Sequence, residues 1–97
     1  MPNDLIIGTI KYHISQHGGI YSNWYVGITK DPKERILTQH NVGLINFPLY
    51  FDAGSSENAR SIEKYFVDFL KTKGNPGGGD YNTKYVYVYF IKNNARQ

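Results

Sequence analysis

The feature that most restricts the possible folds of this chain is a short apolar run followed directly by a strong helix start. The run Trp24–Thr29 is apolar with β-branched residues, as a buried strand is. Asp31 can cap a helix, Pro32 suits its first position, and Glu34 completes a capping box three residues after the cap. The sequence therefore predicts a strand followed at once by a helix that runs to about His40.

Periodicity predicts the remaining elements. Leu5–Ser15 is apolar and β-branched, and it alternates through Thr9–Ile14, which favours a first strand that pairs with Trp24–Thr29 as an antiparallel hairpin. The order strand, strand, helix, strand, helix, strand predicts an α/β (α+β) fold with a small three- to four-stranded mixed or antiparallel sheet flanked by helices. The later elements are a strand over Phe47–Asp52, a helix over Glu57–Lys73 and a strand over Tyr85–Ile91.

Length and composition favour one domain over residues 1–97, because 97 residues can bury a modest core. The chain has no cysteine, so neither disulfides nor thiolate metal sites contribute. No leader-like start or membrane span is seen, and we expect a soluble, cytoplasmic protein. The net charge of +3 favours a polyanionic partner such as nucleic acid.

Glu63 is unusual because it falls inside the apolar stripe of the predicted second helix. At about 100° per residue it lies about 40° from Ala59 and about 20° from Leu70 around the helix. A carboxylate there must find a partner, since burying an unpaired charge is costly. It either bends out to water or a lysine, or binds a hard divalent cation such as Mg²⁺, which takes few protein carboxylates.

Arg35 lies in the first turn of the capped helix. A guanidinium beside the free backbone donors of a helix start can hold a phosphate or stabilise charge that develops on it. The alternative is a solvated arginine paired with Glu34 or Asp31. Lys30, Lys33 and Lys84 are further candidates for phosphate contacts.

Tyrosines are frequent in this chain and could pack in the core or do chemistry. Tyr12 and Tyr25 fall on the two strands of the predicted hairpin, where a phenol near a metal or an arginine could lose its proton and act as a base. Packing is the alternative for both. In the last strand Tyr85, Tyr87 and Tyr89 face one way, while the side chains between them face the other.

Two other patterns are weaker. The spacing of His13, His17 and His40 matches no zinc pattern, but His40 follows Arg35 on the same predicted helix and is kept as a candidate catalytic residue. The run Gly77–Gly79 lacks the lysine-hydroxyl ending of a phosphate loop, so no nucleotide cofactor is expected.

Taken together, several segments resemble the GIY-YIG nuclease superfamily, over nearly the whole chain. They occur in the family's order and on the predicted element types: Trp24–Ile36 with Tyr25-Val26-Gly27 and Arg35, His40-Asn41, Ala59–Phe66 with Glu63, Gly74–Gly79 and Tyr85–Tyr87. The resemblance implies an endonuclease that depends on a divalent metal, Mg²⁺ or Mn²⁺.

The resemblance also implies roles for single residues. The first-motif tyrosine would activate water, Arg35 would contact the scissile phosphate, and Glu63 would bind the metal. Tyr25 matches the second motif. A literal Gly19-Ile20-Tyr21 is too close to Tyr25, so the first-motif tyrosine is assigned to Tyr12. Gln39 replaces the family's helix histidine or tyrosine, and the late asparagine has two candidates, Asn75 and Asn82.

Three functions are consistent with these features. The leading hypothesis is an endonuclease that hydrolyses phosphodiester bonds, with DNA as the expected substrate. The alternative is a nucleic-acid-binding module of the same fold with weakened or lost activity. A third is a protein-interaction domain that docks partners at a sheet edge. Because the chain is short, specificity would come from substrate shape or from a partner protein.

Overall fold

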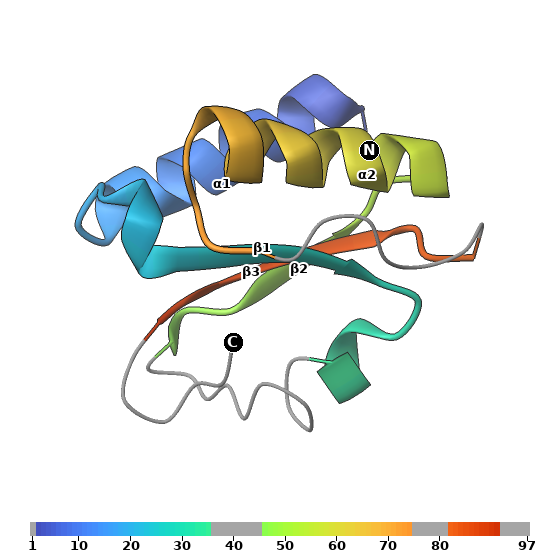
Figure 1. Cartoon of the computed structure of the whole chain (residues 1–97). Coiled ribbons are helices and arrows are strands. Elements are labelled where there is room, and N and C mark those ends of the chain that lie inside the picture. The colour runs from blue at the N-terminus through green and yellow to red at the C-terminus, as the bar shows by residue number, and fades with distance from the viewer. Residues whose placement is uncertain (1, 36–45, 75–81, 92–97) are drawn as a thin grey trace.

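The computed structural model describes residues 2–35, 46–74 and 82–91 and shows a three-stranded antiparallel sheet covered by helices (Figure 1). The predicted α+β class is confirmed. Among these residues no helix is long and apolar enough to cross a membrane. The elements are α1 (Asn3–Gln16), a 3₁₀ turn (Tyr21–Asn23), β1 (Trp24–Thr29), β2 (Leu49–Asp52), α2 (Ser56–Lys64), a π-helical turn (Tyr65–Phe69) and β3 (Tyr85–Phe90).

The predicted first strand is wrong, because Leu5–Ser15 lies within helix α1. Ile6, Ile10 and Ile14 are spaced by four residues, which places them on one side of a helix, and all three are fully buried. Burial of this stripe outweighs the strand preference of β-branched isoleucine. There is consequently no hairpin between this segment and β1.

The predicted strand over Trp24–Thr29 is confirmed, but its neighbour in the sheet comes from the far end of the chain. The sheet order is β1-β3-β2, with Gly27 opposite Tyr87 and Tyr25 opposite Tyr89. Strand β2 pairs with the other side of β3, as the predicted third strand, and begins at Leu49. The last strand therefore forms the centre of the sheet.

The two faces of the sheet carry different side chains. Val86 and Val88 of β3 face the helices and join the isoleucines of α1 in the main core. Tyr87 and Tyr89 face the opposite way and form a second cluster with Tyr25 of β1. The alternation predicted for the last strand is confirmed, and it separates an aliphatic face from a tyrosine face.

Helix α2 is tied to the outer edge of β1 by the chain that follows it. Ser55 caps the helix by accepting a hydrogen bond from the Asn58 amide at 3.1 Å. Beyond the π-helical turn, the Lys73 amide donates to the Trp24 carbonyl at 2.8 Å, and the Val26 amide donates to the Lys73 carbonyl at 3.0 Å. The helix predicted to reach Lys73 therefore ends earlier and passes into a short parallel bridge with β1.

The predicted cap at Asp31 is confirmed, because its Oδ1 accepts a hydrogen bond from the Glu34 amide at 3.2 Å. Helical turns then cover Pro32 to Arg35, on the sheet face opposite α1 and α2 (Figure 1). The rest of the predicted helix, to His40, lies outside the described residues. Arg35 is thus placed under the tyrosine face of the sheet.

Substitutions of two glycines, one within α1 and one just after it, test whether this part of the chain is helical. Gly8 lies inside α1, where an added Cβ would meet no atom within 4 Å, so Gly8→Ala is expected to raise the free energy of unfolding by roughly 0.5–1 kcal/mol. Gly18 has equally open space but a φ of +109°, so Gly18→Ala is expected to lower it. Urea unfolding of both variants measures the difference. A loss of stability in Gly8→Ala would contradict a helix at this position.

Candidate active site

The site begins with a glycine that makes room for a tyrosine. Tyr87 of β3 leans across β1 and lies over Gly27, its cross-strand partner. A Cβ at Gly27 would meet the Tyr87 hydroxyl, and it would lie 2.5 Å from Cζ and 2.8 Å from Cε1 of the same ring. Real Cβ atoms do not approach other heavy atoms so closely. The glycine is therefore needed for the phenol to pass over the strand.

The Tyr87 phenol ends at Arg35. The Nε of Arg35 donates a hydrogen bond to the Tyr87 hydroxyl at 3.2 Å. Tyr25 stacks near Tyr87, with ring centroids 6.0 Å apart. The phenol of Tyr25 also contributes to raising the pKa of the Arg35 guanidinium. Hydrogen bonding to Tyr87 is the main cause that raises the pKa of Arg35, and the guanidinium is charged at physiological pH in any case.

Tyr87 stays a neutral phenol. Burial raises the pKa of Tyr87, although the hydrogen bond and the charge of Arg35 oppose the shift. The expectation that an arginine makes such a tyrosine more acidic does not hold for Tyr87, because desolvation is the larger effect. Its hydroxyl therefore accepts from Arg35 and keeps a proton that it can donate in turn.

Glu63 of α2 lies on the helix side of the sheet, close enough to Arg35 for the two charges to interact. Its predicted position inside the apolar stripe is confirmed, because it is only 3 % exposed between the buried Ile62 and Phe66. Burial raises the pKa of Glu63 to about 7, while the charges of Arg60 and Arg35 lower it and Asp68 raises it. Within the described part of the chain the carboxylate makes no hydrogen bond. Among the residues that the structure describes, Glu63 is thus a buried acid with no hydrogen-bonding partner, in the field of two arginines.

A single divalent cation fits the oxygen donor that the site offers. Residues 2–35, 46–74 and 82–91 contain no group of three or more acidic or imidazole side chains that could hold a metal. Mg²⁺ nevertheless needs only one or two carboxylates when water and substrate phosphate complete its shell. The Glu63 carboxylate, which makes no hydrogen bond within the described residues, would be such a ligand. The residues present therefore fit a metal shared with the substrate rather than an ion enclosed by protein.

The structure brings together three of the predicted site residues, Tyr25, Arg35 and Glu63, and separates a fourth from them. Tyr12 lies on the outer face of α1 with 67 % of its surface exposed, so its predicted pairing with Tyr25 is wrong. The reason is the change from strand to helix in this segment. His40, Gln39 and Asn75 lie outside the described residues.

Tyr87 is the site residue that sequence reasoning missed. It was expected on one face of the last strand, yet nothing in the local sequence distinguishes it from Tyr85 or Tyr89. The available signal was Gly27, since a glycine inside a strand indicates that a neighbouring group approaches closely. The register between the strands was needed to identify that group as Tyr87.

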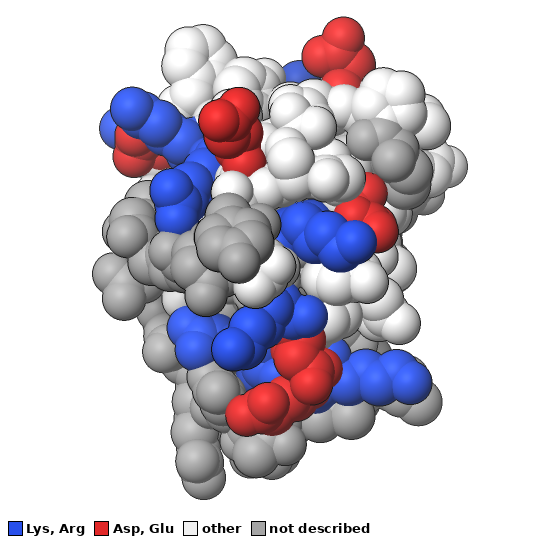
Figure 2. All heavy atoms as spheres, turned by 90° about the vertical axis from the view of Figure 1, so that its right-hand side faces the viewer, with Lys and Arg blue, Asp and Glu red and all other residues white. Residues whose placement is uncertain are grey.

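The predicted phosphate contacts differ in their surroundings. Lys30 and Lys33 are exposed beyond the end of β1. Lys84 comes just before β3 and lies 3.6 Å from Asp52, with its ammonium group 5.8 Å from the ring centroid of Tyr85. Figure 2 faces this end of the sheet and shows Lys and Arg side chains spread over it, with Asp and Glu among them. The surface is basic in places without being uniformly positive.

Comparisons of the chain with protein families, with curated proteins and with solved structures found no match. The geometry of the site and the sequence resemblance are therefore the basis for a functional proposal.

The raised pKa of Glu63 predicts how stability depends on pH. Between about pH 4.5 and 7 the folded protein holds a proton that the unfolded chain has lost, so stability falls as pH rises through this window. Glu63→Gln removes the buried charge and is expected to stabilise the protein by roughly 1–3 kcal/mol at pH 8, with little effect at pH 4. Denaturant unfolding at both pH values measures this difference.

Glu57→Gln is the matched control, because Glu57 is exposed on the same helix. It should give no comparable gain at pH 8. Equal effects of Glu63→Gln at both pH values would show that Glu63 is not buried as an acid.

Proposed function

We propose that the chain is an endonuclease that depends on Mg²⁺ or Mn²⁺ and hydrolyses phosphodiester bonds in nucleic acid, with DNA as the first substrate to test. The observation that supports this most is the position of Arg35. Its guanidinium is hydrogen-bonded to Tyr87 and lies within electrostatic range of Tyr25 and Glu63. A group that could bind a phosphate, a phenol that carries a proton and a carboxylate that could bind a metal therefore lie near one another, which supports the proposal.

Arg35 would bind the scissile phosphate and offset the negative charge that develops on it during attack. The hydrogen bond to Tyr87 fixes the plane of the guanidinium before substrate arrives, which reduces the reorganisation needed in the reaction. Arg35 is half-buried, whereas Tyr25 and Tyr87 are buried, so the phosphate would meet the arginine first.

Tyr87 takes the role that the sequence resemblance gave to Tyr12. Its hydroxyl would orient the attacking water, held in place by Arg35 on one side and by Gly27 below. The strand that carries it comes last in the chain, whereas the resemblance places the first motif ahead of Tyr25. In this proposal a tyrosine still lies beside Tyr25 and Arg35, as the resemblance implies. It comes from the last strand of the chain instead of the first.

Glu63 would hold the divalent ion. When bound, the ion polarises the phosphate and lowers the pKa of an attached water. Protons compete for the same carboxylate, and because the pKa of Glu63 is about 7, metal-dependent cleavage should decline as pH falls below 7.

A second candidate is a nucleic-acid-binding module of the same fold without catalysis. The burial of Tyr25, Tyr87 and Glu63 favours it, because substrate must reach groups that are at most 5 % exposed. Exposed Lys30 and Lys33 would still contact phosphates. This candidate predicts salt-sensitive binding that Arg35→Ala weakens, with no cleavage in any metal.

Two tyrosine variants test whether Tyr87, or Tyr12 as the resemblance implied, takes part in the reaction. With plasmid and branched DNA in Mg²⁺ or Mn²⁺, Tyr87→Phe is expected to lower the cleavage rate about 100-fold, because it removes the hydroxyl that orients water. Tyr12→Phe removes the same atom from an exposed helix face and should leave the rate unchanged. Glu63→Ala should abolish cleavage, as should removal of the metal with EDTA. Full activity in Tyr87→Phe or in Glu63→Ala would refute the mechanism.

A further inference from the structure

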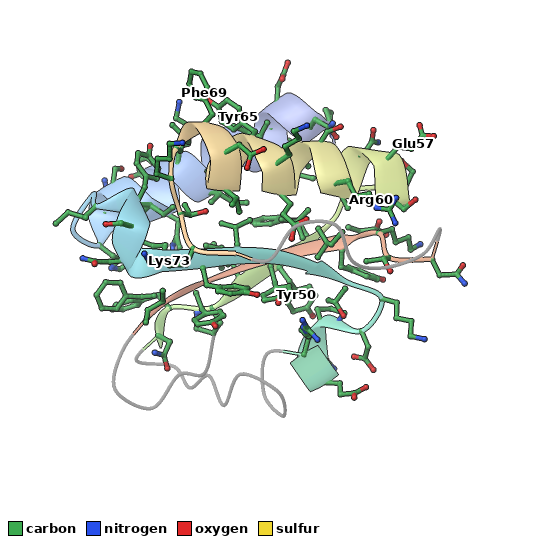
Figure 3. The ribbon with its side chains drawn as sticks, viewed as in Figure 1. Tyr50, Glu57, Arg60, Tyr65, Phe69 and Lys73 are labelled. Atoms are coloured by element: carbon green, nitrogen blue, oxygen red, sulfur yellow. The ribbon has the colours of Figure 1, made fainter. Side chains whose placement is uncertain are left out.

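Tyr50 is an exposed aromatic residue within strand β2. Its neighbours Leu49 and Phe51 pack against the main core, so the alternation of a strand turns Tyr50 to the tyrosine face of the sheet. In Figure 3 it lies on the side of the sheet away from α1 and α2. Tyr50 is 46 % exposed, whereas Tyr87, directly opposite it on β3, is 1 % exposed. The tyrosine face is therefore open to solvent at Tyr50.

The Tyr50 ring has no stacking partner in the part of the chain that the structure describes. The three buried tyrosines of this face, Tyr25, Tyr87 and Tyr89, stack on one another. Tyr50 contacts only the ring of Tyr85, with the centroids 6.4 Å apart and the ring planes at 71° to each other. A flat ligand could therefore stack on Tyr50 without displacing another stacked ring.

Tyr50 lies within reach of a strand whose phosphate is held by Arg35. Tyr87 pairs with Gly27 on one side and with Tyr50 on the other, so Gly27 and Tyr50 lie about 10 Å apart, which is two strand spacings. The Tyr87 hydroxyl lies over Gly27 and accepts a hydrogen bond from Arg35 at 3.2 Å. One or two nucleotides can bridge this separation between guanidinium and ring.

The surroundings of Tyr50 favour a nucleobase over an apolar protein segment. Lys84 lies 3.6 Å from Asp52, and its ammonium group lies 5.8 Å from the ring centroid of Tyr85. The ring pair of Tyr50 and Tyr85 thus adjoins charged groups, whereas protein partners dock on continuous apolar patches. Sites for single-stranded nucleic acid combine exposed aromatic rings with cationic groups that contact the backbone.

We propose that Tyr50 stacks on an unpaired nucleobase of the substrate, next to the phosphate that Arg35 holds. This inference rests on the proposed nuclease function and specifies its substrate as a single strand or an unpaired segment. A fully paired duplex fits less well, because neighbouring base pairs cover the faces of its bases. Every base has a flat aromatic face, so this contact adds affinity without reading the sequence.

The test compares a single-stranded DNA oligonucleotide with an abasic one of the same length, which keeps the phosphates and lacks the bases. With fluorescence anisotropy in EDTA, Tyr50→Ala is expected to raise Kd for the normal oligonucleotide roughly tenfold and to leave Kd for the abasic one unchanged. Tyr50→Phe keeps the ring and should bind like the unaltered protein. Tyr12→Ala is the matched control, because it removes an exposed ring from α1 and should change neither Kd.

Equal losses on both oligonucleotides in Tyr50→Ala, or a loss of the same size in Tyr12→Ala, would overturn the stacking role. Failure of the unaltered protein to bind the single strand would overturn it too. Cleavage in Mg²⁺ or Mn²⁺ is measured separately. The expected pattern of Kd values without cleavage would support stacking by Tyr50 and refute the nuclease function, whereas cleavage with equal losses on both oligonucleotides would do the reverse.

Discussion

The hydrogen bond from Arg35 to Tyr87 is the interaction on which the site depends. It joins the short helical turn after β1 to the last strand of the sheet, and it can form only because Gly27 leaves space for the phenol. The same strand order that brings Tyr87 beside β1 also buries the valines of β3 under the helices. Core formation and site formation thus require one register between β1 and β3.

Burial of Glu63 works against stability when the carboxyl is ionised. An acid held away from water costs free energy when it is ionised, and the described residues give it no hydrogen bond in return. Such a cost is typical of a group that awaits a ligand, because a bound cation would supply the missing partner. The charges of Arg60 and Arg35 lower the pKa of Glu63 and so keep its ionised form accessible near neutral pH.

Local signals in the sequence predicted the elements around Arg35 and Glu63 well. The cap at Asp31 and the acid inside an apolar helical stripe each depend on residues a few positions apart, and both are confirmed. The prediction for Leu5–Ser15 failed because isoleucines at four-residue spacing suit a helix, while their β-branched side chains and the run around Thr9–Ile14 favour a strand.

Tyr87 could not be identified from local signals at all. Its partner Gly27 lies in a distant part of the sequence, and only the pairing of β1 with β3 brings the two together. A hairpin between neighbouring segments was the simpler expectation, and it pointed to Tyr12 instead. Pairing between strands that are far apart in the sequence depends on the burial of whole sheet faces, and a short motif does not reveal it.

Binding of Mn²⁺ tests most directly whether Glu63 and the tyrosine face of the sheet form one metal site. With ¹³C-labelled tyrosine, paramagnetic Mn²⁺ broadens the NMR signals of rings that lie near it. We expect broadening of Tyr87 and Tyr25 at low Mn²⁺ concentration, with Tyr12 unaffected, and loss of the effect in Glu63→Gln. Broadening that persists in Glu63→Gln, or that spares Tyr87, would contradict a metal site shared by Glu63 and the tyrosine face.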